Sequence, residues 1–520
     1  MLKTCSIIIC TVGFLLFKLS AQPVLAKPPA SQTVLAKVRE YRSQNEAAIL
    51  TELTELLAIP NVSSDKENIR INAEHLSAML RKRGLKTRLL QVEDSAPVVF
   101  GELRTAGASK TVVVYMHYDG QPVNPENWTT PPWQPTLLDK QRELGGQEID
   151  LSKVTSPLDG ETRLYARSAS DDKSPIVAML AALDALQAAK IPLSVNLKFF
   201  LEGEEEAGST NVAAILQKYL HLLDANVWLF CDGPVHQTRR PQVVFGVRGV
   251  TGLRLTTYGA LRPLHSGHYG NWAPNPIMLM VHLLASMRDL DSKILIDGFY
   301  DDIQPLTATE RRALAESPNI DAKLRQELGI AVTEGHGKRL EEQIMQPALN
   351  FRGIQSGGAA VRNAIQTEAT AALGFRLVPN QTLEKVRERV EAHIRKQGFH
   401  IVYDEPELEA RLKHAKIVRL RWSGGYPPLR TSMDLPVSKA LIQVMEEATD
   451  QPIVKMPTLG GSLPLYKFDQ ILRRPLIVVP MVNHDNNQHA ENENLRIQNL
   501  WDGIELYASI LARLGQVWKD

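Results

Sequence analysis

Hydrophobic residues recur at every third or fourth position over 33–60 and 67–83, which predicts two amphipathic helices near the start of the chain. The pattern then changes to short apolar runs at 97–103 and 111–116. The second run contains three consecutive valines, which is typical of a strand covered on both faces of a sheet. Helix and strand then alternate, with helices predicted at 174–189 and about 209–220 and strands at 195–201 and 226–231. This alternation predicts an open α/β sheet.

A different pattern begins near Gly246 and lasts to about 405. It predicts a strand at 250–259, a helix at 274–289, a polar and mostly helical stretch at 308–346, a strand pair at 367–378, a helix at 382–397 and a strand at 399–404. We interpret 246–405 as a smaller α+β domain inserted into a larger one, which comprises 27–245 and 406–520. The second part of the larger domain carries predicted strands at 415–421 and 476–480 and predicted helices at 436–450 and about 495–514. A chain of 520 residues is long enough for two such domains.

The N-terminal residues have the pattern of a signal peptide. Lys3 precedes an apolar run from Ser6 to Phe17, and the small-residue sequence Val24-Leu25-Ala26 precedes Lys27. Residues 1–26 therefore predict a cleaved signal peptide and a secreted or periplasmic protein. The alternative is an N-terminal membrane anchor, for which the run is short, because a bilayer requires about 20 apolar residues. We expect no stable membrane span after cleavage.

Charge and cysteine content exclude several classes of protein. The chain has 59 basic and 58 acidic residues, so nothing in its balance favours a nucleic-acid partner. Cys5 and Cys10 lie in the predicted signal peptide, which leaves Cys231 as the one cysteine of the mature chain and excludes an internal disulfide bond. Cys231 ends an apolar run, so we expect it to be buried and not to act as a nucleophile. The Gly-x-Ser-x-Gly motif of many serine hydrolases is not present in the sequence.

Metal-binding residue types follow several of the predicted strands. His117 begins where the strand at 111–116 ends, and Asp119, two residues later, points to the same face and can orient its imidazole. Asp232 follows the strand at 226–231. Glu205 and Glu206 follow the strand at 195–201, at the edge of the sheet where like charges require a cation in order to coexist. Open α/β sheets bind ligands at this edge.

Two further candidates have plausible structural interpretations of their own. Asp171 precedes a predicted helix, where an aspartate often serves as an N-cap. His489 lies in a polar loop, where a histidine is usually solvated. Taken together, however, the two histidines, the carboxylates and one spare glutamate match the needs of a two-metal hydrolase with its own general base.

In their order along the chain, these motifs resemble the dinuclear zinc peptidase family of carnosinase-like dipeptidases, carboxypeptidase G, aminoacylases and succinyl-diaminopimelate desuccinylase. The matching motifs are H-x-D at 117, D-D-K at 171, E-E-x-G-S at 205, the acid at 232 and H-x-x-N-E at 489. The long insertion and the loop from Trp128 to Trp133 are most similar to the carnosinase-like branch. The resemblance implies an α/β catalytic domain with a central mixed sheet flanked by helices, interrupted by an α+β lid and dimerisation domain.

The resemblance also implies a role for each residue. Asp171 would bridge two zinc ions, His117 and Asp232 would complete one site, and Glu206 and His489 would complete the other. Glu205 would be the general base for a hydroxide shared by the metals, and Asp119 would support His117. His265 would stabilise the oxyanion, often from the partner subunit of the family's homodimer, while Arg376, Gly461 and Ser462 would bind the substrate carboxylate.

The expected activity is hydrolysis of the amide bond of dipeptides or short peptides. A deacylase of N-acyl amino acids is the alternative within the family, and Asp rather than Glu at position 232 favours the dipeptidase. A non-catalytic peptide-binding member is a third possibility. This hypothesis predicts that a ligand or the base has been lost, but the five expected ligands and the expected base are all present. Two Zn²⁺ per subunit are expected, although the same ligands suit Mn²⁺ or Co²⁺.

Overall fold

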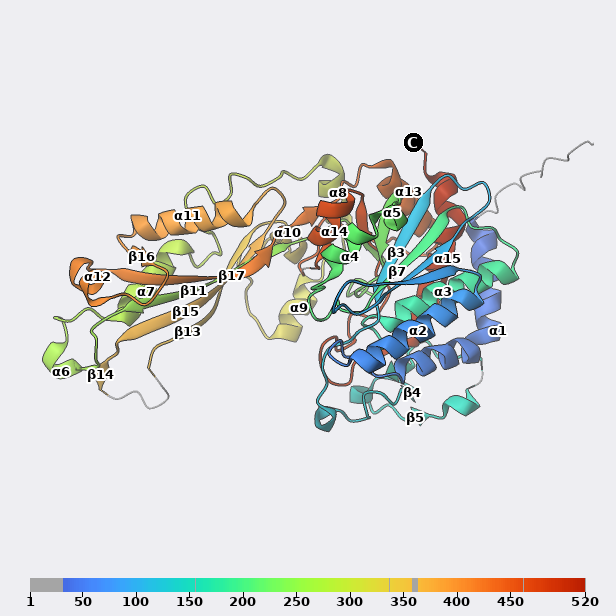
Figure 1. Cartoon of the computed structure of the whole chain (residues 1–520), viewed down its shortest axis with the longest axis horizontal. Coiled ribbons are helices and arrows are strands. Elements are labelled where there is room, and N and C mark those ends of the chain that lie inside the picture. The colour runs from blue at the N-terminus through green and yellow to red at the C-terminus, as the bar shows by residue number, and fades with distance from the viewer. Residues whose placement is uncertain (1–30, 155, 336, 358–362, 462, 520) are drawn as a thin grey trace, which may run out of the picture.

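The computed structural model describes residues 31–154, 156–335, 337–357, 363–461 and 463–519. The chain forms two lobes joined end to end, as Figure 1 shows. The predicted signal peptide at 1–26 lies outside the described residues. No helix among those described has the length and apolar character needed to cross a membrane.

The larger lobe is built on an eight-stranded mixed sheet. Its central strands β7 (Asn196–Glu202), β3 (Thr111–His117) and β8 (Val227–Phe230) are adjacent and parallel. This confirms the predicted α/β class with a central mixed sheet. The outer strands are β1 (Lys86–Leu90) and β2 (Val98–Leu103) on one side and β20 (Leu476–Val478), β9 (Gln242–Val244) and β19 (Val454–Met456) on the other.

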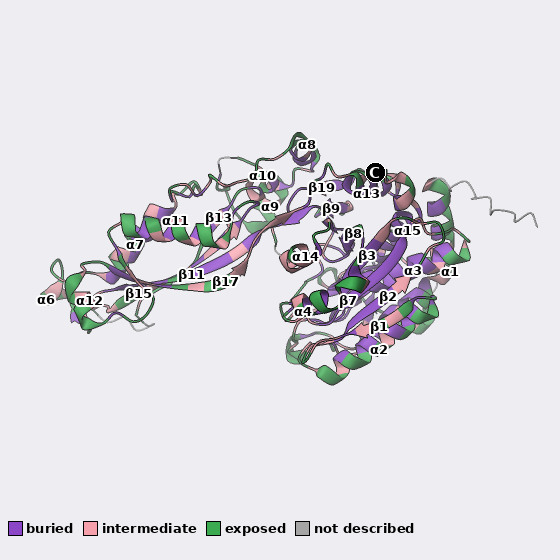
Figure 2. Ribbon diagram, turned by 45° about the horizontal axis from the view of Figure 1, so that its top comes forward, coloured by how far each residue is buried: buried purple, intermediate pink, exposed green. Residues whose placement is uncertain are grey.

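Helices cover both faces of this sheet. The side chains of β3 are therefore buried on both sides, which explains why its sequence is apolar throughout. Val112 and Val114 pack into one hydrophobic cluster, and Val113 and Tyr115 pack into the cluster on the opposite face. The first cluster contains residues of α1 (Ser31–Leu57), α2 (Lys66–Lys82), α3 (Lys173–Ala188), α13 (Pro436–Glu447) and α15 (Ile497–Val517). The second contains residues of α4 (Val212–Lys218), α5 (Leu220–Leu223) and α14 (Leu465–Leu472). The buried strands appear as the purple centre of the lobe in Figure 2.

The region between β3 and α3, predicted as a loop, contains additional short elements. A four-stranded sheet forms there in the order β21-β6-β4-β5. Its strands are β4 (Thr136–Leu138), β5 (Glu148–Ile149), β6 (Arg163–Tyr165) and β21 (Asn494–Arg496), and the short 3₁₀ helices nearby are η1 (Pro125–Asn127), η2 (Arg142–Leu144) and η3 (Leu151–Lys153). The antiparallel pairing of β21 with β6 links the loop that holds His489 to the chain just before Asp171.

The smaller lobe is a five-stranded sheet with helices on one face. The strand order is β13 (Ala348–Gln355), β15 (Glu368–Leu377), β11 (Gly249–Tyr258), β17 (Ile417–Tyr426) and β16 (His400–Val402). Its core includes residues of α7 (Pro276–Met287) and α11 (Leu383–Lys396). At the end far from the larger lobe lie α6 (Ser266–Tyr269), α12 (Leu408–Lys413) and the pair β12 (Leu264–His265) with β14 (Ala364–Ile365) (Figure 1).

Two features of this lobe differ from the sequence prediction. The strand predicted at 415–421 for the larger domain is β17, which pairs with β11, so the boundary at 405 falls inside this sheet. The chain returns to the larger lobe only after Tyr426, where β18 (Leu429–Arg430) pairs with β10 (Gly246–Val247). The strand pair predicted at 367–378 is instead one continuous strand, β15, and its partner β13 was not predicted.

The polar stretch at 308–346 lies at the junction of the lobes (Figure 1). It contains α8 (Ala308–Glu316), α9 (Asp321–Leu328) and α10 (Leu340–Ile344). Glu316 of α8 forms an ion pair of 3.1 Å with Lys455 of β19, an edge strand of the larger sheet. Although it is inserted with the smaller domain, α8 therefore packs on the larger one.

Candidate metal centre

The candidate metal ligands converge because three adjacent parallel strands end at one edge of the larger sheet. His117 is the last residue of β3, and Asp232 lies two residues beyond β8. Glu205 and Glu206 lie just beyond β7, which pairs with β3 on its other side. Parallel strands present their carboxyl ends at a common edge, so residues separated by more than a hundred positions meet there.

Asp171 and His489 complete the centre. The Nε2 atom of His117 lies 2.9 Å from Oδ1 of Asp171 and 3.9 Å from an oxygen of Asp232. The Nε2 atom of His489 lies 3.0 Å from Oδ2 of Asp171 and 3.3 Å from an oxygen of Glu206. The two oxygens of the Asp171 carboxylate therefore face two different histidines, which is the arrangement that a carboxylate bridging two cations requires.

Two groups of ligand atoms are compact enough to hold one ion each. In one group, atoms of Asp171, Glu206 and His489 all lie within 4.8 Å of one another. In the other, the third member beside His117 and Asp232 is Asp172, which sequence reasoning missed. Oδ1 of Asp172 is buried and has no hydrogen-bond partner, while Oδ2 accepts from the backbone N–H of His117 at 3.3 Å. Nitrogen and oxygen donors with a buried oxygen left unsatisfied fit a divalent cation.

The concentration of buried carboxyl groups changes their acidity. Burial, reinforced by the negative charge of Asp171, raises the pKa of Glu206 to about 7 and that of Asp232 to about 6. Burial also raises the pKa of Asp171, but hydrogen bonds from His117 and His489 outweigh it and hold that pKa well below its usual range. Carboxylates packed this closely repel one another, so divalent cations would stabilise their ionised forms.

Asp119 connects the histidine to the glutamate pair. Its carboxylate accepts the backbone N–H of Glu205 at 3.1 Å and that of Glu206 at 3.0 Å. The same carboxylate lies 3.4 Å from Nδ1 of His117, and the backbone carbonyl of Asp119 lies 3.1 Å from that nitrogen. The sequence suggested support of His117 alone, whereas the structure shows that Asp119 also holds the backbone of both glutamates.

Glu205 lies beside both groups of ligand atoms without belonging to either. Burial raises its pKa well above the usual value, and the charges of Asp232 and Asp171 add to the effect while His117 opposes it. The turn that follows Glu205 is held by Lys467 of α14, whose Nζ donates to the carbonyl oxygens of Gly208 at 2.8 Å and Ser209 at 2.7 Å. Glu205 is therefore a half-buried carboxyl group on a well-anchored turn.

Glu493 is a second residue whose role the sequence did not reveal. Its fully buried carboxylate accepts four hydrogen bonds from the chain leading to Asp171. Three of the donors are the backbone N–H groups of Ser168, Ser170 and Asp171, and the fourth is the Ser170 hydroxyl. A fifth comes from Arg167 at 2.6 Å. This carboxylate organises the segment that positions Asp171. The only signal in the sequence is its place at the end of the H-x-x-N-E motif.

The predicted substrate-binding residues are not all near the metal centre. Arg376 lies on β15 near the junction of the lobes, beside Arg248, whose pKa falls to about 10 because of burial and the charge of Arg376. Gly461 lies close by, since its carbonyl accepts the backbone N–H of Arg248 at 3.4 Å. Ser462 lies outside the described residues. His265 lies at the far end of the smaller lobe, beside α6 in Figure 1, and cannot reach the centre of its own chain in this arrangement.

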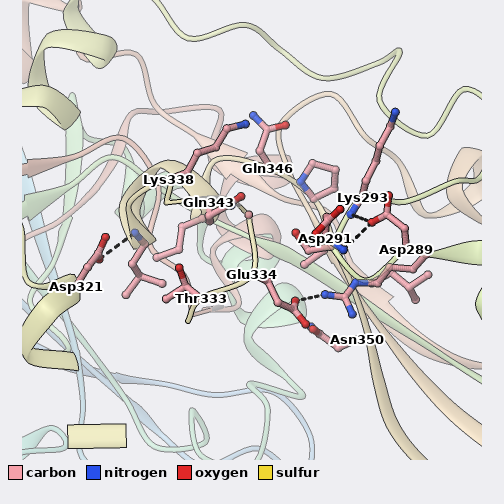
Figure 3. Close-up of a pocket in the computed structure, with 18 of the residues that line it drawn as sticks. Asp289, Asp291, Lys293, Asp321, Thr333, Glu334, Lys338, Gln343, Gln346 and Asn350 are labelled. Atoms are coloured by element: carbon pink, nitrogen blue, oxygen red, sulfur yellow. Dashed lines mark hydrogen bonds and ion pairs between the residues drawn. The ribbon is translucent and has the colours of Figure 1, made fainter. Parts of the chain in front are cut away.

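A large cavity lies at the junction of the two lobes. Its volume is about 790 Å³, and none of the candidate metal ligands lines it. Figure 3 shows polar and charged side chains around it, including Lys338, Gln343, Gln346 and Glu334. Ionic groups of the wall are partly paired with each other, as in the contact between Arg288 and Glu334.

An α/β sheet with paired nitrogen and oxygen ligands at its carboxyl edge, and a half-buried glutamate beside them, defines a metal-dependent hydrolase. The model of Peptidase family M20/M25/M40 matches residues 113–513, and the chain belongs to this family of metallopeptidases. The match covers every predicted site residue.

Individual relatives agree with this assignment. The chain is 24% identical over 506 residues to the Cys-Gly metallodipeptidase dug1 of Schizosaccharomyces pombe, covering 93% of this chain and 99% of that protein. It is 26% identical to the Beta-Ala-His dipeptidase of Homo sapiens over 81% of this chain and 78% of that one. An M20 family metallo-carboxypeptidase from Sulfolobus solfataricus has a similar structure, with a TM-score of 0.69, 28% identity and coverage of 90% of this chain and 99% of its own.

Proposed function

We propose that the protein is a dizinc dipeptidase that hydrolyses the peptide bond of small peptides with a free carboxylate. The observation that carries the proposal is the bridging position of Asp171, whose two carboxylate oxygens face His117 and His489 separately. Dipeptidase activity is named for the relatives from S. pombe and H. sapiens, which supports this substrate class.

The ligand geometry suggests how the metals would be held. Asp171 would bridge them, with His117 and Asp232 on one side and Glu206 and His489 on the other. Asp172, next to His117 and Asp232, would add a carboxylate within reach of the first ion. Bound divalent ions supply the polarisation of the peptide carbonyl and a lower pKa for the attacking water. Zinc is the metal that we propose for this ligand set, and Mn²⁺ and Co²⁺ are the alternatives.

Glu205 would act as the general base and then as the general acid. It would take a proton from the attacking water and pass it to the nitrogen of the leaving amine. Burial raises its pKa, which suits a carboxyl group that must carry a proton midway through the reaction. Asp119 would keep this glutamate in place through the backbone of residues 205 and 206, because it accepts both N–H groups.

Arg376, Gly461 and Ser462 would bind the free carboxylate of the substrate. A guanidinium group can hold a carboxylate with two parallel hydrogen bonds. We expect Arg376→Ala to raise KM for a dipeptide at least tenfold, while the amidated dipeptide, which lacks the carboxylate, is much less affected. Steady-state kinetics on the pair of substrates measures this difference. An equal rise in KM for both substrates would show that Arg376 does not bind the substrate carboxylate.

Metal content and substrate release together test the proposed function. We expect two zinc equivalents per chain by elemental analysis, and release of amino acids from dipeptides that chelation abolishes and zinc restores. N-acyl amino acids in the same panel distinguish the alternative, a deacylase with the same centre. Metal bound without cleavage of any member would favour a non-catalytic peptide-binding protein. Cleavage that survives complete removal of metal would contradict the proposal.

A homodimer through the smaller lobe is part of the proposal. His265 is distant from the centre of its own chain, so the oxyanion donor would come from the partner subunit. Two features support an interface there. The outward face of α7 exposes Ile277, Met278 and Val281. The edge strand β13 is exposed along most of its length, and such an edge favours pairing with a second copy.

The N-terminal residues support a proposal about location. We propose that residues 1–26 direct export and are removed, so that the mature protein begins at Lys27 in the periplasm or outside the cell. N-terminal sequencing of the protein recovered from a secreting host tests this. A mature chain that still begins at Met1 in the membrane fraction would favour the anchor.

A further inference from the structure

The segment that joins α1 to α2 lies against the turn after β3, which carries His117 and Asp119. The backbone N–H of Gly120 donates to the carbonyl of Asn61 at 2.9 Å, and Val62 forms a parallel bridge with Gly120. This segment comes before the residues that match the family model. The turn that positions His117 is therefore supported by a part of the chain outside that match.

The same segment is attached to the start of α3. Lys173, the first residue of α3, is completely buried, and its Nζ donates to the carbonyl oxygens of Leu56 at 2.8 Å and Ile59 at 3.0 Å. A lysine is a favourable partner for carbonyl groups at the end of a helix. These contacts hold the end of α1 against the D-D-K motif, which contains Asp171.

Asn61 connects the two ligand-bearing regions through its side chain. Its amide is completely buried, and Nδ2 donates to the carbonyl of Tyr118 at 2.6 Å and to the Ser168 hydroxyl at 2.9 Å. Tyr118 directly follows His117. Ser168 lies three residues before Asp171. One amide nitrogen therefore joins the two segments whose side chains meet where Nε2 of His117 lies 2.9 Å from Oδ1 of Asp171.

Ser168 has a backbone conformation that depends on such support. Its φ is 62°, in the left-handed region that residues with a Cβ rarely adopt, and it is completely buried. Such a conformation persists where the surrounding contacts determine it. The N–H of Ser168 donates to Glu493 at 3.0 Å, and its carbonyl accepts the N–H of Lys173 at 3.2 Å. The hydrogen bond from Asn61 to its hydroxyl fixes the side chain as well.

The two regions also pack too closely to move independently. A Cβ added to Gly120 would clash with the Ser168 hydroxyl and would lie 3.2 Å from Nδ2 of Asn61. Close-packed groups transmit a displacement to their neighbours. A shift of the Asn61 amide would therefore move both the turn after β3 and the segment before Asp171.

We propose that Asn61 is a positioning residue of the metal centre, whose amide sets the position of His117 relative to Asp171 by fixing the segments that carry them. This inference rests on the proposed two-metal centre and adds a residue that determines its geometry. Asn61 acts through the backbone of Tyr118 and the side chain of Ser168. Groups that orient metal ligands in this way commonly change metal affinity about 10–100-fold when they are removed.

Zinc affinity and the absorption spectrum of the Co²⁺-loaded protein test the proposal. The intensity of the visible cobalt bands depends on coordination geometry, so it reports the position of the ligands separately from catalysis. In Asn61→Ala we expect zinc affinity, measured by competition with a chelating dye, to fall about 10–100-fold and the cobalt bands to change in position and intensity. Ser168→Ala removes one of the two hydrogen bonds of the amide and keeps the other, so its loss of affinity should be less than about tenfold.

Asn196→Ala is the matched control. Asn196 is another buried asparagine, and its side chain ties β7 to the loop before β3, since Nδ2 donates to the carbonyl of Ala108 at 3.2 Å and Oδ1 accepts the N–H of Thr105 at 3.0 Å. It is the first residue of β7, at the opposite end of that strand from the metal centre. Thermal melts of the metal-free proteins should show a lower melting temperature for both variants, whereas only Asn61→Ala should have altered zinc affinity and an altered cobalt spectrum.

The possible results separate this inference from the proposed function. A folded Asn61→Ala protein with the zinc affinity and cobalt spectrum of the wild-type protein overturns the inference, as do equal losses of affinity in Asn61→Ala and Asn196→Ala, and both results leave the proposed function intact. If Asn61→Ala does not fold, Asn61→Ser carries the same comparison, because it keeps a single donor in a smaller side chain. A wild-type protein that binds neither zinc nor cobalt overturns the inference and the proposed function together.

Discussion

Single carboxylates have separate tasks in this centre, and their surroundings determine which task each one has. Asp171 faces two histidines, whereas Glu205 faces none at hydrogen-bond distance among the contacts described and is half-buried. Asp119 and Glu493 act on the backbone, the first on residues 205 and 206 and the second on the segment before Asp171. Hydrogen bonds therefore distinguish the proposed ligand and the proposed base from the two carboxylates that support the backbone.

The assignment of Glu205 as base leads to a simple test at the scale of one residue. Glu205→Gln should lower kcat by about 10²–10⁴-fold, because an amide cannot accept and return the proton. Its zinc content should stay at two equivalents, since Glu205 is outside both ligand groups. Elemental analysis of the purified variant checks this. If zinc is lost along with activity, base and ligand have been exchanged between Glu205 and Glu206.

The role of Glu493 can be tested separately from the chemistry. Glu493→Gln would place an amide NH₂ among donors that now meet a carboxylate oxygen, so the segment holding Asp171 would shift. We expect metal affinity to fall about 10–100-fold, as measured by competition with a chelating dye.

Asp485→Asn is the matched control for this substitution. Asp485 is a carboxylate on the same loop, and its hydrogen bonds go to Arg163, Asn483 and Gln141 rather than to residues 168–171. The metal affinity of the Asp485→Asn variant should be close to that of the wild-type protein. An equal loss in both variants would indicate general destabilisation of the loop.

At the scale of elements, most of what surrounds the site could be predicted from the sequence. The strands β3 and β8 are largely continuous apolar runs, β7 is apolar from Phe199 to Leu201, and a helix, α3, begins at the D-D-K motif close to where it was predicted. The strand β17 was assigned to the wrong sheet for a physical reason. Val418 and Leu420 are apolar at alternate positions and would suit either core, and they join the smaller one through pairing with β11, more than 150 residues earlier. Local pattern contains no information about that partner.

His236 lies in the larger lobe, near Arg339 of the segment after α9, and its burial leads to a prediction about how stability depends on pH. Burial, together with the charges of Arg240, His484 and Arg339, lowers the pKa of His236 to about 4, whereas an unfolded histidine titrates near 6.5. The unfolded state therefore binds the extra proton first, so the stability that His236 contributes is present above pH 6.5 and is lost as the pH falls toward 4.

His236→Gln should reduce this dependence. Thermal melting temperatures of the wild-type protein and of the variant, measured between pH 7.5 and 4, should converge as the pH falls. Parallel curves over that range would mean that other groups cause the loss of stability.

At the scale of the whole molecule, the two lobes separate residues that one reaction is proposed to need. The metal ligands lie at one edge of the larger sheet, and His265 lies at the far end of the smaller lobe (Figure 1). The exposed apolar face of α7 and the open edge of β13 lie on the smaller lobe, where a second copy could bind. The proposed homodimer would bring these residues together in an active site shared between two subunits.

Mixing two inactive variants tests this arrangement. His265→Ala should lower kcat by about 10²–10³-fold, as loss of an oxyanion donor does. Mixed with Glu205→Gln under conditions that exchange subunits, it should recover about a quarter of the wild-type activity per chain, since half of the dimers are hybrids with one complete site each. A mixture with no more activity than the sum of its parts would contradict a site shared between subunits.

The sequence by itself determined the class of fold and placed metal-binding residue types at the ends of the central strands, because both depend on local chemistry: apolar runs that must be buried, and charged residues at their ends that need a cation. It could not determine the roles of Asp172 and Glu493, the sheet to which β17 belongs, or the pairing of Arg248 with Arg376 beside a cavity. Those depend on contacts between segments far apart in the chain. Tertiary structure alone decides them, because strand register and the packing of the lobes bring the partners together.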